Sequence, residues 1–437
     1  MLSNPQKTCI GDFFNLIGGY AFKGSDFIGS GIPVIKIKNV KANQMLYDNL
    51  SHVSDKFLNS GKVKAIQKGD LLITMSGNRF DGSPSTWVGK VAQFKEDHPF
   101  LLNQRVGILR PKDGVRLEQR FFAYSLSSDV YQNEFISIAT SSGGQANLSP
   151  KQILGAPINV PTLPKQKAIA GILGSLDDKI ELNRKMSETL EEMAGAIFKS
   201  WFMDFDPVVA KSEGLKPEGM DAETAKLFPD SFVESEIGRI PKGWRARPLT
   251  ELIDVNPSRQ LQREKVAPYL DMGALSLRSA RTDATILRPF SSGSKFRNGD
   301  TLVARITPCL ENGKTGFVDN LEDGETGWGS TEFIVLCPKA PLPSSYGYFL
   351  ARTDEFRSFA ITNMTGTSGR QRVVVDSFSH FFLAEPPSEI AITFGDIATD
   401  ILKQMKAYDA ETLTLSALRD SLLPKLLSGE IIVRSAL

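Results

Sequence analysis

The sequence has little of what metal sites, disulfide frameworks and membrane insertion require. Its three cysteines, Cys9, Cys309 and Cys337, are far apart and form no C-x-x-C pair, so we predict neither a structural zinc site nor disulfides. No run of about 18 apolar residues is present, and the first residues lack the apolar core of a secretion signal. We therefore expect a cytoplasmic protein that does not enter a membrane.

Sequence motifs of enzymes are missing as well. The three histidines, His52, His98 and His380, have neither the spacing of metal ligands nor that of a catalytic triad. Asn312 to Thr315 ends like a phosphate-binding loop, but Pro308 stands where that motif needs its first glycine. There is no G-x-S-x-G and no aromatic N/D-P-P-[YF] tetrapeptide of amino-methyltransferases. In a chain of 437 residues this lack favours binding over catalysis, and we predict no catalytic residue and no metal ligand.

The length and the distribution of charge indicate several domains, of which the first is basic. A chain of 437 residues is too long for one typical core. Its net charge is only +1, but residues 1–160 contain 18 Lys and Arg against 12 Asp and Glu, whereas residues 204–243 contain 5 against 9. A basic domain is compatible with nucleic-acid binding but does not establish it.

An internal repeat with a period of about 225–235 residues is the most informative feature, and it is far too long for a solenoid. Three pairs of segments recur in the same order: 68–74 with 298–304, 105–111 with 332–338, and 142–145 with 368–371. Each copy mixes β-branched strand patterns with helical apolar periods. We predict two α+β domains, arranged as 1–160 domain 1, 161–203 central helix, 204–243 acidic linker with one short helix near 222–227, 244–387 domain 2, and 388–437 C-terminal helix.

Each predicted domain is followed by a helix of about 40 residues, or roughly 60 Å. Each helix has an apolar stripe at heptad spacing with polar residues in its middle. We predict that the two helices pair as an antiparallel coiled coil through Ile169, Leu173, Leu176, Ile180, Ile397, Ile401, Leu415 and Leu418. The alternative is that each helix packs only on its own domain. Pro424 should kink or end the second helix.

The helical segments resemble the specificity subunits of type I restriction-modification systems. Residues 163–208 are similar to the family's central helical region, including Leu-Pro-x-Gln-x-x-Ile-Ala at 163–170 and Phe-Lys-Ser-Trp-Phe at 198–202. Residues 418–431 resemble its closing segment, and the loops at 141–149 and 367–374 resemble the polar loop before each helix. The second helix begins with Pro-Pro-Ser-Glu and lacks the Leu-Pro-x-Gln start.

The resemblance implies two target-recognition domains related by a pseudo-twofold axis, each of which reads one half of a split, asymmetric DNA site. The helices would hold the domains apart, set the unread gap and dock two modification (methyltransferase) and two restriction (translocase and nuclease) subunits. This chain would bind no cofactor, while S-adenosylmethionine, ATP and magnesium would belong to the partner subunits.

Contacts with base edges call for Arg, Lys, Asn, Gln or Ser on protruding loops. The DNA-binding candidates are Ser76, Asn78, Arg79, Gln145 and Asn147 in domain 1, and Arg305, Asn312, Lys314, Arg370, Gln371 and Arg372 in domain 2. Two alternatives remain open at this point. The chain could be a scaffold whose two domains bind proteins, or a self-contained DNA methyltransferase or nuclease.

Overall fold

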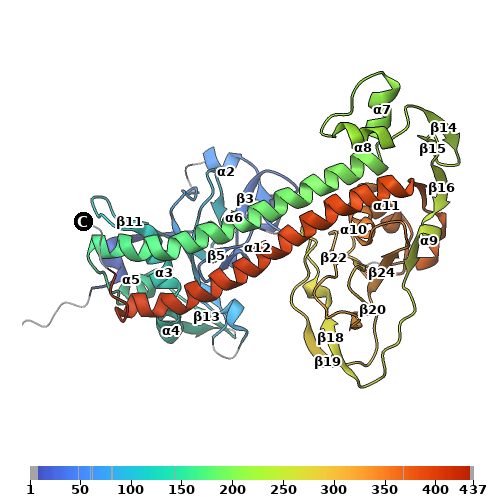
Figure 1. Ribbon diagram of the computed structural model, residues 1–437. Coiled ribbons are helices and arrows are strands. Elements are labelled where there is room, and N and C mark those ends of the chain that lie inside the picture. Colours follow the sequence, from blue (N-terminus) through green and yellow to red (C-terminus); the bar gives the residue numbers. More distant parts are fainter. Residues whose placement is uncertain are drawn as a thin grey trace, which may run out of the picture. The chain divides into compact units, whose positions relative to one another are not determined.

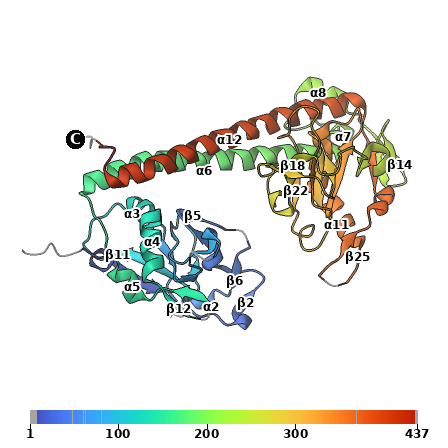
Figure 2. The same cartoon turned by 90° about the horizontal axis from the view of Figure 1, so that it is seen from below.

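The computed structural model describes residues 8–47, 49–59, 61, 63–79, 82–142, 144–367 and 369–433 (Figures 1 and 2). The chain forms two compact units. Unit 1 comprises Met1–Ile180 and Thr414–Leu437, and unit 2 comprises Glu181–Leu413. Each unit therefore contains one copy of the repeat and a segment of each long helix.

Unit 1 is built on two four-stranded sheets and one small sheet. The main sheet, in the order β1-β11-β7-β9, is antiparallel and comprises Phe14–Gly18, Val106–Pro111, Leu71–Thr74 and Val91–Gln93. The second, β10-β3-β6-β2, comprises Leu101–Leu102, Ile32–Ile35, Ser51–Val53 and Phe27–Ile28. The small sheet, β12-β13-β8, comprises Thr140–Ser142, Gln145–Asn147 and Ser76–Gly77, and a hairpin joins β4 (Val40–Lys41) to β5 (Gln44–Met45). The helices are α1 (Ile10–Phe13), α2 (Lys56–Asn59), α3 (Gln119–Ser127), α4 (Asp129–Ile138) and α5 (Pro150–Gly155).

Strand β7 explains where the core of unit 1 lies. Its four apolar or β-branched residues are all buried, because both faces of the main sheet are covered. Leu71 and Ile73 belong to the cluster that includes Phe122 of α3, and Leu72 belongs to the cluster on the opposite face.

Unit 2 repeats the strand order of the main sheet, whereas its second sheet places the fourth strand at the opposite edge. Its main sheet, β17-β24-β21-β22, comprises Ile253–Val255, Phe333–Pro338, Thr301–Ala304 and Thr315–Phe317. The second, β19-β18-β23-β20, comprises Ile286–Pro289, Val266–Leu270, Gly327–Gly329 and Lys295–Phe296. Two-stranded pairs join β25 (Met364–Thr365) to β26 (Arg372–Val373) and β16 (Arg245–Pro248) to β27 (Phe382–Glu385). The helices of this copy are α9 (Leu249–Leu252), α10 (Ser344–Arg352) and α11 (Asp354–Thr362).

The predicted repeat is confirmed by matching elements in the two units, including their turns. Gly69 and Gly299 have φ of +95° and +90°, and the aspartate that follows each is buried. Asp70 accepts the backbone N–H three residues earlier and pairs with Arg110 at 2.6 Å, and Asp300 accepts in the same way but pairs with Arg259. The Gly-Asp motif therefore fixes the turn before the central strand in both copies.

The polar loops match with a register one residue away from the predicted one. Leu148 donates its N–H to the Met75 carbonyl, and Val373 donates to the Arg305 carbonyl. Asn147 thus corresponds to Arg372, and Gln145 to Arg370. Short polar loops have no alternation of apolar and polar residues to fix an alignment. The alignment of residues 142–145 with 368–371 was therefore wrong by one residue. Gly143 and Ser368 of these loops lie outside the described residues.

The two long helices are α6 (Leu163–Phe202) and α12 (Ser388–Ser428), and they run antiparallel to each other in both units. In unit 1, Ile169 and Leu173 of α6 share a core with Leu426 of α12. In unit 2, Phe198 of α6 packs edge to face on Phe394 of α12. Both helices also pack on the domains, so the coiled coil and the alternative of separate packing each describe part of the interface.

One expectation for the second helix needs correction. Leu418 is 45% exposed, and Leu422 and Leu426 contact the core of unit 1 instead. Of the two outcomes predicted for Pro424, the helix does not end there but continues to Ser428. Leu426 is 1% exposed, and burying it after the proline offsets the loss of one helical hydrogen bond.

The segment predicted as an acidic linker, 204–243, has structure of its own. It contains α7 (Asp206–Ser212), α8 (Ala222–Leu227) and a hairpin of β14 (Phe232–Ser235) and β15 (Gly238–Pro241). Phe228 and Ile240 are buried in the core of unit 2. Along the described part of the chain, no helix combines the length and apolarity needed to span a membrane.

Candidate nucleic-acid interface

The polar loop of unit 1 is organised around Ser76, which is only 2% exposed. Its hydroxyl donates to Asn147 Oδ1 at 2.7 Å, and Arg105 Nη1 donates to both side chains at 3.2 Å. Ser76 therefore supports the loop and does not face a ligand, contrary to its selection as a DNA-binding candidate. Arg105, which is exposed, was missed, although it is the first residue of the recurring segment 105–111.

The remaining candidates of unit 1 differ in how free their side chains are. Asn78 is half-buried and donates to Thr86 Oγ1 at 2.9 Å. Arg79 donates to the backbone carbonyl of Ala139 and thereby ties the loop after β8 to the end of α4. Gln145 is exposed on β13. Gln145, with Arg105 and Asn147 beside it, is thus the part of this loop that is most open to a ligand.

In unit 2 the structure brings together Arg305, Gln371 and Arg372. Arg305 Nε donates to the Val373 carbonyl at 3.0 Å, and the Gln371 N–H donates to Thr307 Oγ1 at 3.2 Å. Arg372 makes a two-pronged ion pair with Glu332 at 2.7–2.9 Å. Arg305 is half-buried, and its guanidinium supports the small sheet in the way that Arg79 supports the loop of unit 1.

Asn312, Lys314 and Arg370 complete the candidates of unit 2. Lys314 Nζ donates to the Met272 carbonyl at 2.8 Å, which uses one of the three N–H donors of this ammonium. Asn312 and Arg370 are exposed, and their side chains can reach a ligand.

The corresponding polar positions of the two units have different chemistry. Arg105 of unit 1 corresponds to Glu332 of unit 2, and Asn147 corresponds to Arg372. A cation beside an amide in unit 1 is thus replaced in unit 2 by an anion paired with a cation. Two surfaces with one backbone plan but different donors and acceptors can recognise two different ligand sequences.

Each domain is also attached to the long helices by polar contacts. In unit 1, Tyr124 of α3 donates to Asp177 Oδ2 of α6 at 2.6 Å, and Arg419 of α12 donates to Asp177 Oδ1 at 2.9 Å. The Arg120 guanidinium lowers the pKa of the neighbouring Asp178, with which it pairs at 2.7 Å. In unit 2, Tyr348 of α10 donates to Glu191 of α6, and burial raises the pKa of that carboxyl.

Comparisons with known proteins agree with these features over most of the chain. Residues 3–192 match the family model described as the type I restriction modification DNA specificity domain. The chain is 25% identical to the HindI type I restriction enzyme specificity subunit of Haemophilus influenzae, with 92% of this chain and 94% of the relative covered. It is 22% identical to the MjaIX specificity subunit of Methanocaldococcus jannaschii, with 94% and 89% covered.

A solved structure gives the same fold. The type I restriction-modification S subunit from M. genitalium superposes with a TM-score of 0.50 at 14% identity, and 98% of each chain is covered. This chain is therefore similar to type I restriction-modification specificity subunits over most of its length. Its fold is as predicted: two α+β domains and two long antiparallel helices.

The matched model ends at residue 192, within α6. The second α+β domain lies beyond this match and is related to the first by its structural equivalence. Among the described residues, no three His, Cys, Asp or Glu side chains gather closely enough to hold a metal ion.

Proposed function

We propose that this chain is the DNA sequence-specificity subunit of a type I restriction-modification complex, in which each α+β domain reads one half of a split, asymmetric site. The observation that carries the proposal is the pair of equivalent polar loops with different side chains. Two domains with the same loop structure can make two equivalent contacts with one DNA duplex. The loop side chains differ, with Arg105 and Asn147 in unit 1 and Glu332 and Arg372 in unit 2, and this difference suits two different half-sites. The exposed side chains most suited to base contacts are Gln145, Asn312 and Arg370.

The helices would act as the spacer and as the docking surface for the catalytic partners. Leu182, Met186 and Met193 of α6 lie on one helix face and are 40–52% exposed. Exposed apolar stripes of this kind favour a protein partner. The partners would be two modification subunits, which carry S-adenosylmethionine, and two restriction subunits, which use ATP and magnesium. This chain would supply recognition and no catalysis.

The first experiment is co-expression of the chain with the modification subunit of its system, followed by sequencing-based mapping of methyladenine in the host DNA. We expect a split, asymmetric motif with one methylated adenine in each half. Methylation or cleavage by the purified chain alone would instead support a self-contained enzyme. A complex that forms but shows no salt-dependent DNA binding would support the protein-binding scaffold.

A further inference from the structure

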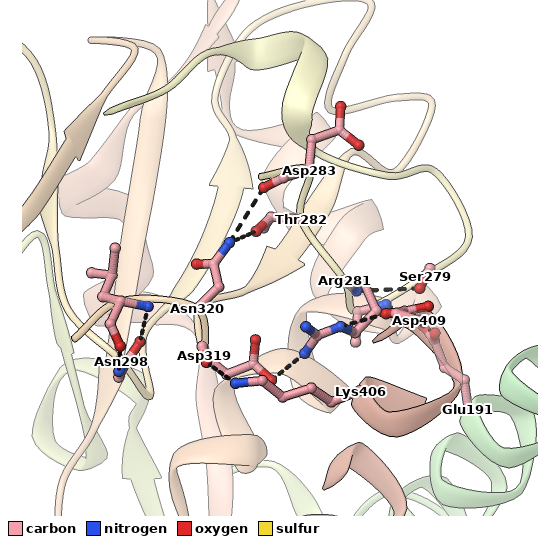
Figure 3. Close-up of polar contacts among 12 residues, drawn as sticks. Glu191, Ser279, Arg281, Thr282, Asp283, Asn298, Asp319, Asn320, Lys406 and Asp409 are labelled. Atoms are coloured by element: carbon pink, nitrogen blue, oxygen red, sulfur yellow. Dashed lines mark hydrogen bonds and ion pairs between the residues drawn. The ribbon is translucent and has the colours of Figure 1, made fainter. Parts of the chain in front are cut away.

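In unit 2, one short segment of the recognition domain contacts both long helices (Figure 3). Arg281 is 16% exposed at its side chain and donates through Nε to Asp409 Oδ2 of α12 at 2.8 Å. Its Nη1 pairs with Asp319 of the domain, whose backbone carbonyl accepts from Lys406 Nζ of α12 at 2.5 Å. Arg281 thus lies between two carboxylates, one from the domain and one from the helix.

The residue before Arg281 is held by the other helix. Ala280 is fully buried and donates its N–H to Glu191 Oε2 of α6 at 2.9 Å. Glu191, itself 9% exposed, also accepts from Tyr348 of α10. Two consecutive residues of the domain are therefore fixed by directional hydrogen bonds, one to α6 and one to α12.

These contacts continue to the loop that carries two of the DNA-binding candidates. Arg352 Nη2 lies 3.5 Å from Glu191 Oε1, while its Nη1 donates to the carbonyls of Leu277 at 2.9 Å and Gly313 at 3.0 Å. Gly313 lies between Asn312 and Lys314. One guanidinium thus links a carboxylate of the spacer helix to the backbone of the predicted reading loop.

The polar contacts of Glu191 and Arg281 contribute more to the orientation of the domain on the helices than to the stability of the fold. A buried ion pair gains little net free energy over apolar packing, because both charges lose their hydration. The core of unit 2 already holds the domain on the helices through Phe198, Tyr346 and Phe394. Apolar packing tolerates small rotations, whereas hydrogen bonds to charged groups are lost when their angle changes.

We propose that Glu191 and Arg281 are positioning residues that fix the second recognition domain on the helix pair and thereby restrict the gap length accepted between the two half-sites. This inference rests on the proposed function. Each added base pair moves a half-site by about 3.4 Å along the DNA and turns it by about 35°. A domain held rigidly on both helices cannot follow that change, whereas a domain held by apolar packing alone can follow part of it.

The test measures DNA methylation by the complex of the full-length chain and the modification subunit. The DNA substrates carry the mapped half-sites and differ in the gap between them, which has the native length, one base pair less or one base pair more. Glu191→Ala and Arg281→Ala should each raise methylation of the altered gaps relative to the native gap by about tenfold, the size expected from losing a charged hydrogen bond. The half-site bases should stay unchanged. Glu191→Gln should keep most of the native preference, because the amide oxygen can still accept from the Ala280 N–H while the amide N–H donates to the Tyr348 hydroxyl oxygen.

Glu188→Ala is the matched control, because Glu188 lies on the same helix and its carboxylate pairs only with Arg184 of that helix among the described residues. It should keep the native gap preference. An equal drop at all gaps in both Glu191→Ala and Arg281→Ala would overturn the inference, as would altered half-site bases. If the wild-type complex methylates no split site, the proposed function fails before any variant is compared.

Discussion

At the scale of single residues, burial separates polar side chains that build the recognition loops from those that can contact DNA. Ser76 and Asn147 of unit 1 bond to each other, and the Arg305 side chain of unit 2 donates to the backbone carbonyl of Val373. Arg370 and Gln145 occupy equivalent positions on the two loops and are exposed. Equivalent, exposed and chemically different side chains are the ones expected to distinguish two half-sites.

We expect Arg370→Ala to relax base preference in one half-site and Gln145→Ala to relax it in the other. Each lost base contact should cost about 1–3 kcal/mol of discrimination. Neither change should lower the midpoint of thermal unfolding, because both side chains are exposed. Methyladenine mapping of each variant complex measures the effect.

Arg239→Ala is the control, because Arg239 is an exposed arginine of the hairpin β14–β15. This variant should keep the base preference in both half-sites. Loss of base preference in both half-sites from Arg370→Ala or Gln145→Ala would contradict the assignment.

The sequence predicted where the polar loops lie but not how their side chains are held. Residue type pointed to Ser76, which is buried and bonded to Asn147, and to Lys314, whose ammonium donates to the Met272 carbonyl. Arg105 was overlooked because a residue at the start of a strand pattern reads as part of the sheet. The position of its side chain depends on contacts with Ser76 and Asn147, which are far from it in sequence.

At the scale of elements, periodicity predicted the two long helices closely because a stripe sustained over 40 residues leaves little ambiguity. In the segment 204–243, predicted as a linker with one short helix near 222–227, α8 lies where that helix was predicted, whereas α7 and the hairpin have too few residues to show a period. The burial of this segment comes from Phe228 and Ile240 in the core of unit 2. Tertiary contacts, rather than local propensity, give this segment its structure.

The polar centre of the helix pair should favour a defined register at the expense of stability. Asn183 is 1% exposed and donates to Glu411 Oε2 at 2.9 Å, while its own Oδ1 has no hydrogen-bond partner among the described residues. Asn183→Leu removes this unsatisfied acceptor, so we expect it to stabilise the chain by about 1–3 kcal/mol. The midpoint of thermal unfolding of the full chain measures the change.

Thr189→Leu is the control for that substitution, because Thr189 is exposed on the same helix and should gain nothing from a larger apolar side chain. A lower unfolding midpoint for Asn183→Leu would show that the bond to Glu411 outweighs the unsatisfied oxygen. The polar centre would then stabilise the pair as well as align it.

At the scale of the whole molecule, duplication would allow one chain to bind the asymmetric site proposed above. The two units share the strand order of their main sheets and their Gly-Asp turns, yet they differ in the polar residues of their loops. Recognition can therefore change in one half without affecting the other. The length of the helices, in contrast, is a property of both halves together.

Helix length should therefore control the gap and leave the half-sites unchanged. Removing residues 179–182 from α6 and 413–416 from α12 shortens each helix by about 6 Å, and four residues are close to one full turn, so the packing faces are nearly preserved. At about 3.4 Å per base pair, methyladenine mapping should find a gap shorter by about two base pairs. Deleting residues 214–217, which lie between α7 and α8, is the control and should leave the gap unchanged. If the shortened helices alter the half-site bases but not the gap, the helices do not set the spacing, and the gap must be determined by the partner subunits.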